Sequence, residues 1–266
     1  MRMAVRIALV VVGLTASTAH AEHHHDMAMM DAGAGSGDVA QPPPFDASVQ
    51  LIAASYSTLT YQGDYEGAIA SVGYSYDRYM VGASLGTYRI LLNGLESYGI
   101  GDLMVHAGAT LVHAGEFQGG VVAMVSAPTG NELAGLGMGH TMLMPSAFGV
   151  WSHDRVTVTV NAGYNRALGQ MEANHDHGVW PLVEPMNMSE ISWGVGADYA
   201  VGLGMHVAAR TGGGHPIGNL IGHERVVGAL RVAWGTGRVD TGVEVQTGFV
   251  GDPYTIRGLL ETALHF

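Results

Sequence analysis

The chain has 266 residues, no cysteine and no lysine, and its 11 basic residues are all arginine. Its formal net charge of −12 disfavours a nucleic-acid partner, because phosphate binding needs a basic surface. Hydrophobic residues make up 47% of the chain, yet no apolar run reaches the roughly 18 residues of a membrane-spanning helix. The apolar content is instead spread over many short, glycine-rich stretches, which suits a β-protein with two different faces.

Residues 1–21 predict a cleaved secretory signal peptide. Arg2 and Arg6 form a positive start, residues 8–14 form a short apolar core, and Ala19-His20-Ala21 matches a small-x-small cleavage site. A membrane anchor is the alternative, but the apolar core is too short for one. We therefore expect export, cleavage before Glu22 and a mature net charge near −14, since two arginines are removed.

Residues 22–44 predict a disordered periplasmic tail. The segment has no hydrophobic periodicity, and residues 42–44 are prolines that form a stiff spacer. It contains a cluster of histidines and methionines: His23, His24, His25, Met27, Met29 and Met30. Imidazole suits copper and other divalent metals, and thioether selects Cu(I), so the tail is a candidate metal-binding segment. A merely polar linker is the alternative.

From Phe45 to Phe266 the hydrophobic pattern changes to period two, which predicts β-strands. In residues 155–165, for example, valines alternate with threonines and asparagines, so one face is apolar and the other polar. About twelve strands are expected: 45–61, 65–77, 79–90, 100–113, 118–126, 140–151, 155–168, 190–201, 205–212, 223–234, 238–249 and 254–266.

The predicted connections alternate between short and long. Tight turns are expected around Asp77 and at four later positions, and longer loops at 91–99, 127–139, 169–189 and 213–222. This asymmetry is typical of an up-and-down antiparallel β-barrel in the outer membrane of a Gram-negative bacterium. A soluble β-sandwich also alternates, but its polar face would carry more lysine and glutamate. The fold class predicted is thus an all-β transmembrane barrel of residues 45–266 that contacts outer-membrane lipid.

Charged residues share the inward parity of their strands and predict a narrow, polar lumen crossed by ion pairs. The candidate pore-lining residues are Asp198, Arg225, Arg231, Asp240, Glu244, Arg257 and Glu261. The chain ends in Phe266 on an alternating strand, which resembles the C-terminal signature by which bacterial barrel-assembly machinery recognises its substrates. That machinery is therefore an expected partner.

Residues 99–131 contain two short motifs, Gly99-Ile100-Gly101-Asp102-Leu103 and Ala127-Pro128-Thr129-Gly130-Asn131. Together they resemble the family named after the meta-pathway of phenol degradation. The resemblance implies an outer-membrane barrel and a transporter of small, aromatic or apolar solutes, and it carries no catalytic residues.

The same motifs have physical roles of their own. Gly101 and Gly130 permit close backbone approach or positive φ, and Pro128 should end its strand because it cannot donate a ladder hydrogen bond. Asp102 has inward parity at the rim, where it can cap loop amides or bind an arginine. We expect it to stabilise a loop.

Two further groups of histidine and methionine invite a metal hypothesis. His175 and His177 lie in the longest loop and suit a divalent ion, although a solvated loop is the simpler interpretation. Met138, His140, Met142 and Met144 lie at and after the 127–139 loop, where Met142 and Met144 are expected to be lumen- or lipid-facing filler. Spacing alone assigns no tetrahedral site.

No catalytic motif is present: the sequence has no GxSxG, HExxH or phosphate-binding loop, and Gly212-Gly213-Gly214 is expected to be a flexible outer loop. The leading hypothesis is a non-enzymatic outer-membrane channel for small solutes, with no cofactor. One alternative is a barrel that handles copper or another metal through its tail. Another is a structural surface barrel without an open pore.

Overall fold

The computed structural model describes residues 44–57, 62–168, 183, 187–218, 224–235, 238–251 and 254–266. This part of the chain is almost entirely β-sheet. Its elements are β1 (Phe45–Ser57), β2 (Gln62–Tyr76), β3 (Tyr79–Leu92), β4 (Leu95–Ile100), β5 (Leu103–Ala114), β6 (Phe117–Ala127), the 3-10 turn η1 (Glu132–Ala134), β7 (Thr141–His153), β8 (Val156–Leu168), β9 (Ser189–Gly202), β10 (Met205–Pro216), β11 (Arg225–Gly235), β12 (Val239–Val250) and β13 (Tyr254–His265).

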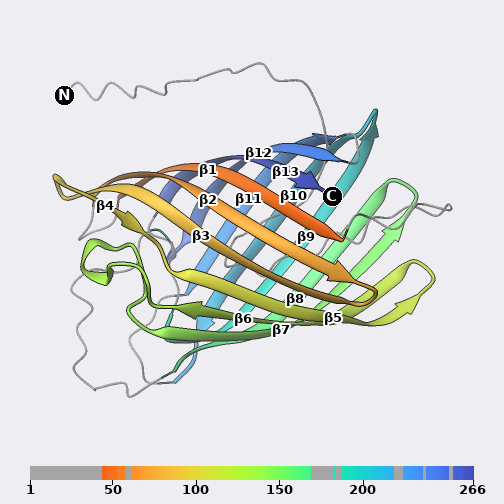
Figure 1. The fold of residues 1–266 in the computed structure, drawn as a ribbon, viewed down its shortest axis with the longest axis horizontal. Helices are drawn as coiled ribbons and strands as arrows, with labels where there is room; N and C mark the ends of the chain where they lie inside the picture. Colours follow the sequence, from red (N-terminus) through yellow and green to blue (C-terminus); the bar gives the residue numbers. More distant parts are fainter. Residues whose placement is uncertain are drawn as a thin grey trace.

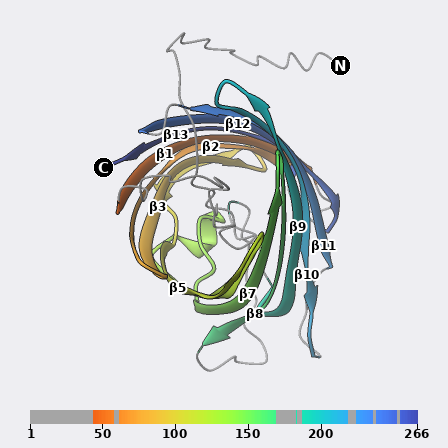
Figure 2. The ribbon, with the colours of Figure 1, turned by 90° about the vertical axis from the view of Figure 1, so that its right-hand side faces the viewer.

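The strands close into a barrel. Consecutive strands pair antiparallel around the ring, and the first strand closes it by pairing with the last, from Asp46 opposite His265 to Tyr56 opposite Tyr254. Strand β4 pairs only with the end of β3, so it extends the wall locally and does not add a thirteenth strand to the ring. The predicted all-β, transmembrane antiparallel barrel of twelve strands is confirmed, and Figure 2 looks almost along its axis.

The two ends of the barrel differ. At one end, two-residue turns join β2 to β3, β5 to β6, β7 to β8 and β9 to β10, and Asp77, Asp154 and Leu203 adopt positive φ of 54°, 51° and 55° there. The C-terminus and the start of β1 lie at this end, on the right of Figure 1. We call it the short-turn end and the opposite one the long-loop end; in outer-membrane barrels short turns face the periplasm.

Side chains alternate between a buried inner face and an exposed apolar outer face. Along β1 the inward Ile52, Ala54 and Tyr56 are 2–6% exposed, whereas the outward Val49 and Leu51 are each 51% exposed. Exposed aromatics gather at the short-turn end: Phe45, Tyr76, Tyr79, Phe117, Trp151 and Phe266. An apolar belt bordered by aromatic residues is the outer surface that lipid requires.

Among the described residues, no helix is long and apolar enough to cross a membrane.

The predicted loop at 91–99 is wrong, because this segment forms a β-hairpin. Strand β3 continues to Leu92 and β4 begins at Leu95. Asn93 and Gly94 between them have positive φ of 49° and 85°. Asn-Gly with both residues at positive φ is the preferred two-residue turn of a β-hairpin. This dipeptide was the signal in the sequence that could have located the hairpin.

The expectation of a flexible loop at residues 212–214 is also wrong, because β10 runs on to Pro216. These glycines lie in the strand where its neighbours approach closely. A Cβ atom on Gly213 would come within 1.9 Å of the Arg225 carbonyl oxygen, and one on Gly214 within 2.3 Å of a Glu190 carboxylate oxygen. Small size, rather than flexibility, explains this glycine run.

The predicted strand 100–113 is interrupted. Thr87 of β3 pairs with Ile100 of β4, whereas Ser84 pairs with Met104 of β5, so one extra residue is inserted in the wall. The insertion falls at Gly101 and Asp102, which belong to neither strand. A bulge of this kind bends a strand and redirects its side chains. Asp102 lies at this bulge, between β4 and β5.

Candidate functional site in the barrel lumen

The Gly-Asp and Pro-Thr-Gly motifs meet at the long-loop end and fasten the β6–β7 loop. Strand β6 ends at Ala127, directly before Pro128, as expected of a residue that cannot donate to a ladder. The Thr129 hydroxyl donates to the Gly101 carbonyl oxygen at 2.8 Å and accepts from the Leu103 amide at 2.9 Å. The loop is thereby tied to the strand break.

Asp102 holds both ends of the same loop. Its carboxylate is 1% exposed; Oδ1 accepts a hydrogen bond from the Gly130 amide at 2.9 Å and Oδ2 accepts one from the Met138 amide at 2.8 Å. The amide-capping role expected for Asp102 is therefore present. Gly130 is required by packing, since a Cβ there would lie 2.4 Å from the Leu136 carbonyl oxygen.

The fastened loop turns into the barrel rather than away from it. In Figure 2 the segment around η1 lies inside the ring of strands. Leu136 is 1% exposed and packs in one cluster with the inward Tyr56, Tyr65 and Tyr88 of β1–β3. Tyr65 and Tyr88 contact each other edge to face, with ring centroids 6.3 Å apart. The inner wall at this end is thus aromatic and apolar, which differs from the polar lumen expected from the sequence.

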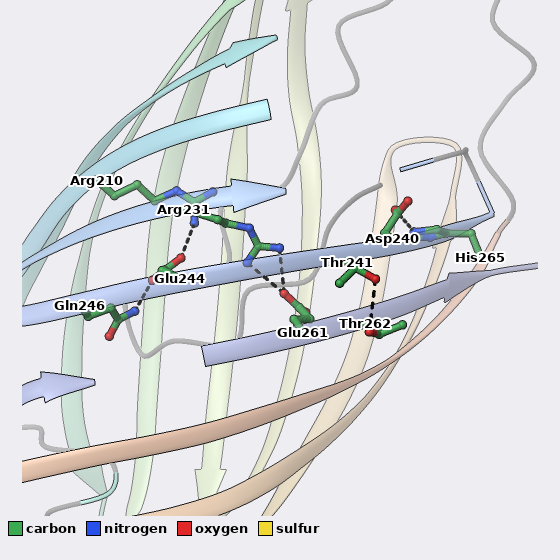
Figure 3. Close-up of polar contacts among 9 residues, drawn as sticks. All are labelled: Arg210, Arg231, Asp240, Thr241, Glu244, Gln246, Glu261, Thr262 and His265. Carbon is green, nitrogen blue, oxygen red and sulfur yellow. Dashed lines mark hydrogen bonds and ion pairs between the residues drawn. The ribbon is translucent and has the colours of Figure 1, made fainter. Parts of the chain in front are cut away.

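The adjoining wall, formed by β10–β13, carries the buried charges (Figure 3). Arg231 on β11 donates from both Nη atoms to Glu261 Oε2 on β13, at 3.0 Å each. Arg210 on β10 lies 3.5 Å from Glu244 on β12, and Gln246 donates a hydrogen bond to Glu244. These residues form a ladder across four strands, which we call the charged wall.

The charged wall also contacts the aromatic wall, across β1. Arg257 on β13 donates from Nε to Gln246 Oε1 at 2.7 Å and from Nη1 to the Tyr65 hydroxyl on β2 at 3.4 Å. The aromatic wall and the charged wall therefore meet through Arg257. Buried charges of both signs that are paired in this way avoid the large desolvation cost of an isolated charge.

Arg225 belongs to a separate cluster near the long-loop end. Its Nη2 donates to Glu190 Oε1 at 2.8 Å, and Glu190 has no solvent exposure. Asn165 donates to the same oxygen at 2.9 Å, and the Asn187 amide side chain donates to Oε2 at 2.6 Å. This fully hydrogen-bonded carboxylate joins β8, β9 and β11.

Two predicted lining residues lie near the short-turn end instead. Asp198 Oδ1 is hydrogen-bonded to His206 Nδ1 at 2.8 Å, and Asp240 Oδ2 is hydrogen-bonded to His265 Nε2 at 2.5 Å. Asp240 is 4% exposed, whereas the side chain of Asp198 is 32% exposed. The seven predicted residues thus all lie on the inner face, but they fall into three groups rather than one.

Sequence reasoning missed Arg210, Gln246 and Glu190, all of which face inward. Alternation contained the signal: Glu190 shares the parity of Asp198 on β9, and Gln246 that of Glu244 on β12. Glu190 and Arg210 were overlooked because they lie close to predicted strand ends, where alternation is least reliable. Gln246 was overlooked because it carries no charge.

The predicted tail ligands His23, His24, His25, Met27, Met29 and Met30, and the loop histidines His175 and His177, lie outside the described residues. Within the described ranges, no group of three or more His, Cys, Asp or Glu side chains is arranged to hold a metal ion. Met142 and Met144 do point inward, with exposures of 0% and 3%.

No family model and no curated protein sequence matches the chain. Solved structures do match its fold. An outer membrane channel from Pseudomonas putida F1 is 13% identical, with a TM-score of 0.64 over 87% of this chain and 98% of that one. The KdgM porin in complex with disordered oligogalacturonate is 8% identical, with a TM-score of 0.56 over 83% of this chain and 99% of the porin.

A third similar structure is the translocator domain of the autotransporter NalP from Neisseria meningitidis. It is 14% identical, with a TM-score of 0.51 over 86% of this chain and 90% of the domain. At such identities the likeness shows the fold, which is that of outer-membrane β-barrels that include channels and porins.

Proposed function

We propose that this protein is an outer-membrane channel for small solutes that combine an apolar or aromatic body with a polar group. The observation that carries the proposal is an inner wall with two adjoining parts of different chemistry. Tyr56, Tyr65 and Tyr88 line the part formed by β1–β3, and buried charges line the neighbouring part formed by β10–β13. A solute with one apolar and one polar side would find a partner on each wall.

The size of the barrel supports this proposal. A ring of twelve strands lies between eight-stranded barrels, which side chains fill, and porins of sixteen or more strands, which leave a wide aqueous channel. In this ring the inward loop at Leu136 occupies the long-loop end. Such a barrel suits a narrow, selective path better than a wide one.

We also propose a cellular location, the outer membrane, and a protein family. An exported chain in the Gram-negative outer membrane fits the exposed apolar belt, and Phe266, 62% exposed at the short-turn end, is available to the assembly machinery. Membership of the family named after the meta-pathway of phenol degradation is supported by its two motifs, which meet through Asp102 and Thr129. We assign no catalytic role.

Single-channel recording of the refolded full chain in a planar bilayer tests the proposal. Discrete conductance steps are expected. Glu244→Gln should shift the reversal potential towards anion selectivity, because it removes a negative charge from the inner wall. Arg210→Gln should shift it towards cation selectivity, because it removes a positive charge. Glu66→Gln and Arg78→Gln, which alter exposed charges elsewhere, are matched controls.

Addition of phenol or another monoaromatic solute should block the steps. A folded protein without conductance steps would overturn the channel and favour a structural barrel. Unchanged permeation after joint substitution of Arg231 and Glu244 would exclude the charged wall as the selective element. A metal-handling role is the second candidate, and the methionine side chains that cluster on the inner wall of β5–β7 favour it.

A further inference from the structure

Methionine side chains gather on the inner wall of β5–β7. Of the eight methionines in the described residues, six pack into one cluster: Met104, Met124, Met138, Met142, Met144 and Met188. The other two, Met80 and Met205, lie apart from it. We call this group the methionine cluster; its five members other than Met188 are at most 7% exposed.

The strand register brings the sulfur-bearing side chains of the cluster together. Met124 on β6 lies directly opposite Met144 on β7, and Met104 and Met142 lie on either side of Ser126. Residues directly opposite in antiparallel strands have Cβ atoms about 5 Å apart, within reach of long side chains. The inward His106 lies opposite Met124 on the other side.

Ser126, at the centre of this arrangement, is an independent sign of a ligand. It has no solvent exposure, and its Oγ makes no hydrogen bond to any residue that the structure describes. Buried hydroxyls are almost always hydrogen-bonded, because an unmade bond costs free energy. A polar atom aimed into an otherwise apolar cluster is expected where an ion or a polar molecule binds.

Packing alone does not account for the choice of methionine. On β1–β3 the inward apolar positions are held by residues such as Ile52, Ile69 and Ile90, and a methionine costs more side-chain entropy to order than an isoleucine. The cluster itself contains no charged residue. Neutral thioethers do not suit hard divalent cations, which need oxygen ligands, but they select soft monovalent ones.

We propose that the methionine cluster is a binding site for Cu(I) in the barrel lumen, formed by Met104, Met124, Met142 and Met144. Met138 extends the site to the β6–β7 loop, because Asp102 holds the Met138 amide while its side chain joins the cluster. An ion bound there would tie the inward loop to β5–β7. The proposal does not depend on channel activity.

Calorimetric titration of the refolded full chain with silver nitrate in chloride-free buffer tests the site, since Ag(I) is a redox-inert probe of thioether ligands. The titration uses a background variant that lacks the other soft ligands of the tail and of the predicted 169–189 loop. His23, His24, His25, His175 and His177 are replaced by Ala; Met27, Met29 and Met30 of the tail, and Met171 and Met186 of the predicted loop, are replaced by Leu. Stoichiometric binding is expected to remain.

In that background, Met124→Leu with Met144→Leu should weaken Ag(I) binding by at least about tenfold, since even outer-shell changes at metal sites have effects of that size. Met80→Leu with Met205→Leu should leave it unchanged. A parallel titration with Cu(I), kept reduced by ascorbate, should show the same pattern. Equal affinity in both double variants, or no binding in the background protein, would overturn the proposal.

Methyl NMR of methionine-labelled wild-type protein avoids any dependence on the folding of variants. Ag(I) should shift the methyl resonances of the methionine cluster, while those of Met80 and Met205 stay in place. Uniform shifts, or shifts that exclude Met124 and Met144, would contradict the site. Neither experiment measures permeation. A bilayer recording without conductance steps would therefore reject the channel function and leave the Cu(I) site unaffected.

Discussion

Asp102 joins parts of the chain that are far apart in sequence through one carboxylate. Its two oxygens accept amides from residues 28 and 36 positions away, at the two ends of the inward loop. Hydrogen bonds to an ionised acceptor are about twice as strong as neutral ones. One residue at the strand break therefore decides where the β6–β7 loop lies.

Asp102→Asn is expected to loosen this loop, because the amide side chain keeps one acceptor and presents a donor to the other backbone amide. Stability should fall by roughly 1–3 kcal/mol, the cost of a buried group left unpaired. Hydrogen–deuterium exchange of the segment 129–138 should become faster. Asp154→Asn, in an exposed short turn, is the control. Unchanged exchange in the Asp102 variant would mean that packing of Leu136 alone holds the loop.

At the scale of the strands, glycine and arginine positions together build the charged wall. Arg231 directly faces Glu244 in the ladder, yet its guanidinium crosses β12 to reach Glu261 on β13. It passes over Gly242, where a Cβ would lie 2.7 Å from an Arg231 nitrogen. The absence of a side chain at one position thus permits an ion pair between strands that are not adjacent.

Arg231→Met should destabilise the barrel by about 3–5 kcal/mol, because it leaves Glu261 as a buried charge without its hydrogen-bonded partner. The measurement is urea-induced unfolding in lipid vesicles, followed by tryptophan fluorescence. The double variant Arg231→Met with Glu261→Leu should recover most of the loss, since it removes both charges. Equal stability of the single and double variants would show that Arg210 alone compensates Glu261.

For the whole molecule, the outer belt and the closed ring are consequences of the same alternation. Outward side chains such as Leu51 and Leu260, paired across the β1–β13 seam, meet lipid, while their neighbours face the lumen. Because β1 pairs with β13, neither the first nor the last strand of the ring presents an unpaired edge within the membrane, where an unpaired backbone group has no water to bind.

Leu51→Arg, near the middle of β1, should therefore destabilise the folded barrel by about 2–4 kcal/mol, whereas Tyr76→Arg at the short-turn end should have an effect of about 0–1 kcal/mol. The folded fraction can be read from heat-modifiable migration after refolding in vesicles of graded urea content. If both variants lost equal stability, the belt would not be the lipid-facing surface at this depth.

The sequence alone was sufficient to predict the barrel, because a period of two assigns every side chain to a face. That is why the seven charged residues at 198–261 were expected inside, and why Asp102 was expected to cap a loop. Pro128 ended its strand for an equally local reason, its missing amide hydrogen. Each of these inferences needs only the residue and its near neighbours.

Only the tertiary structure decided which inward residues meet. Arg257 and Tyr65 are 192 positions apart, and Met188 reaches the cluster of Met104 from the far side of β8. Parity specifies a face but not a neighbour, because register and closure of the ring determine which strands lie together and at what height. Gly213 and Gly214 were misjudged for the same reason: the groups that demand their small size, the Arg225 carbonyl and the Glu190 carboxylate, belong to other strands.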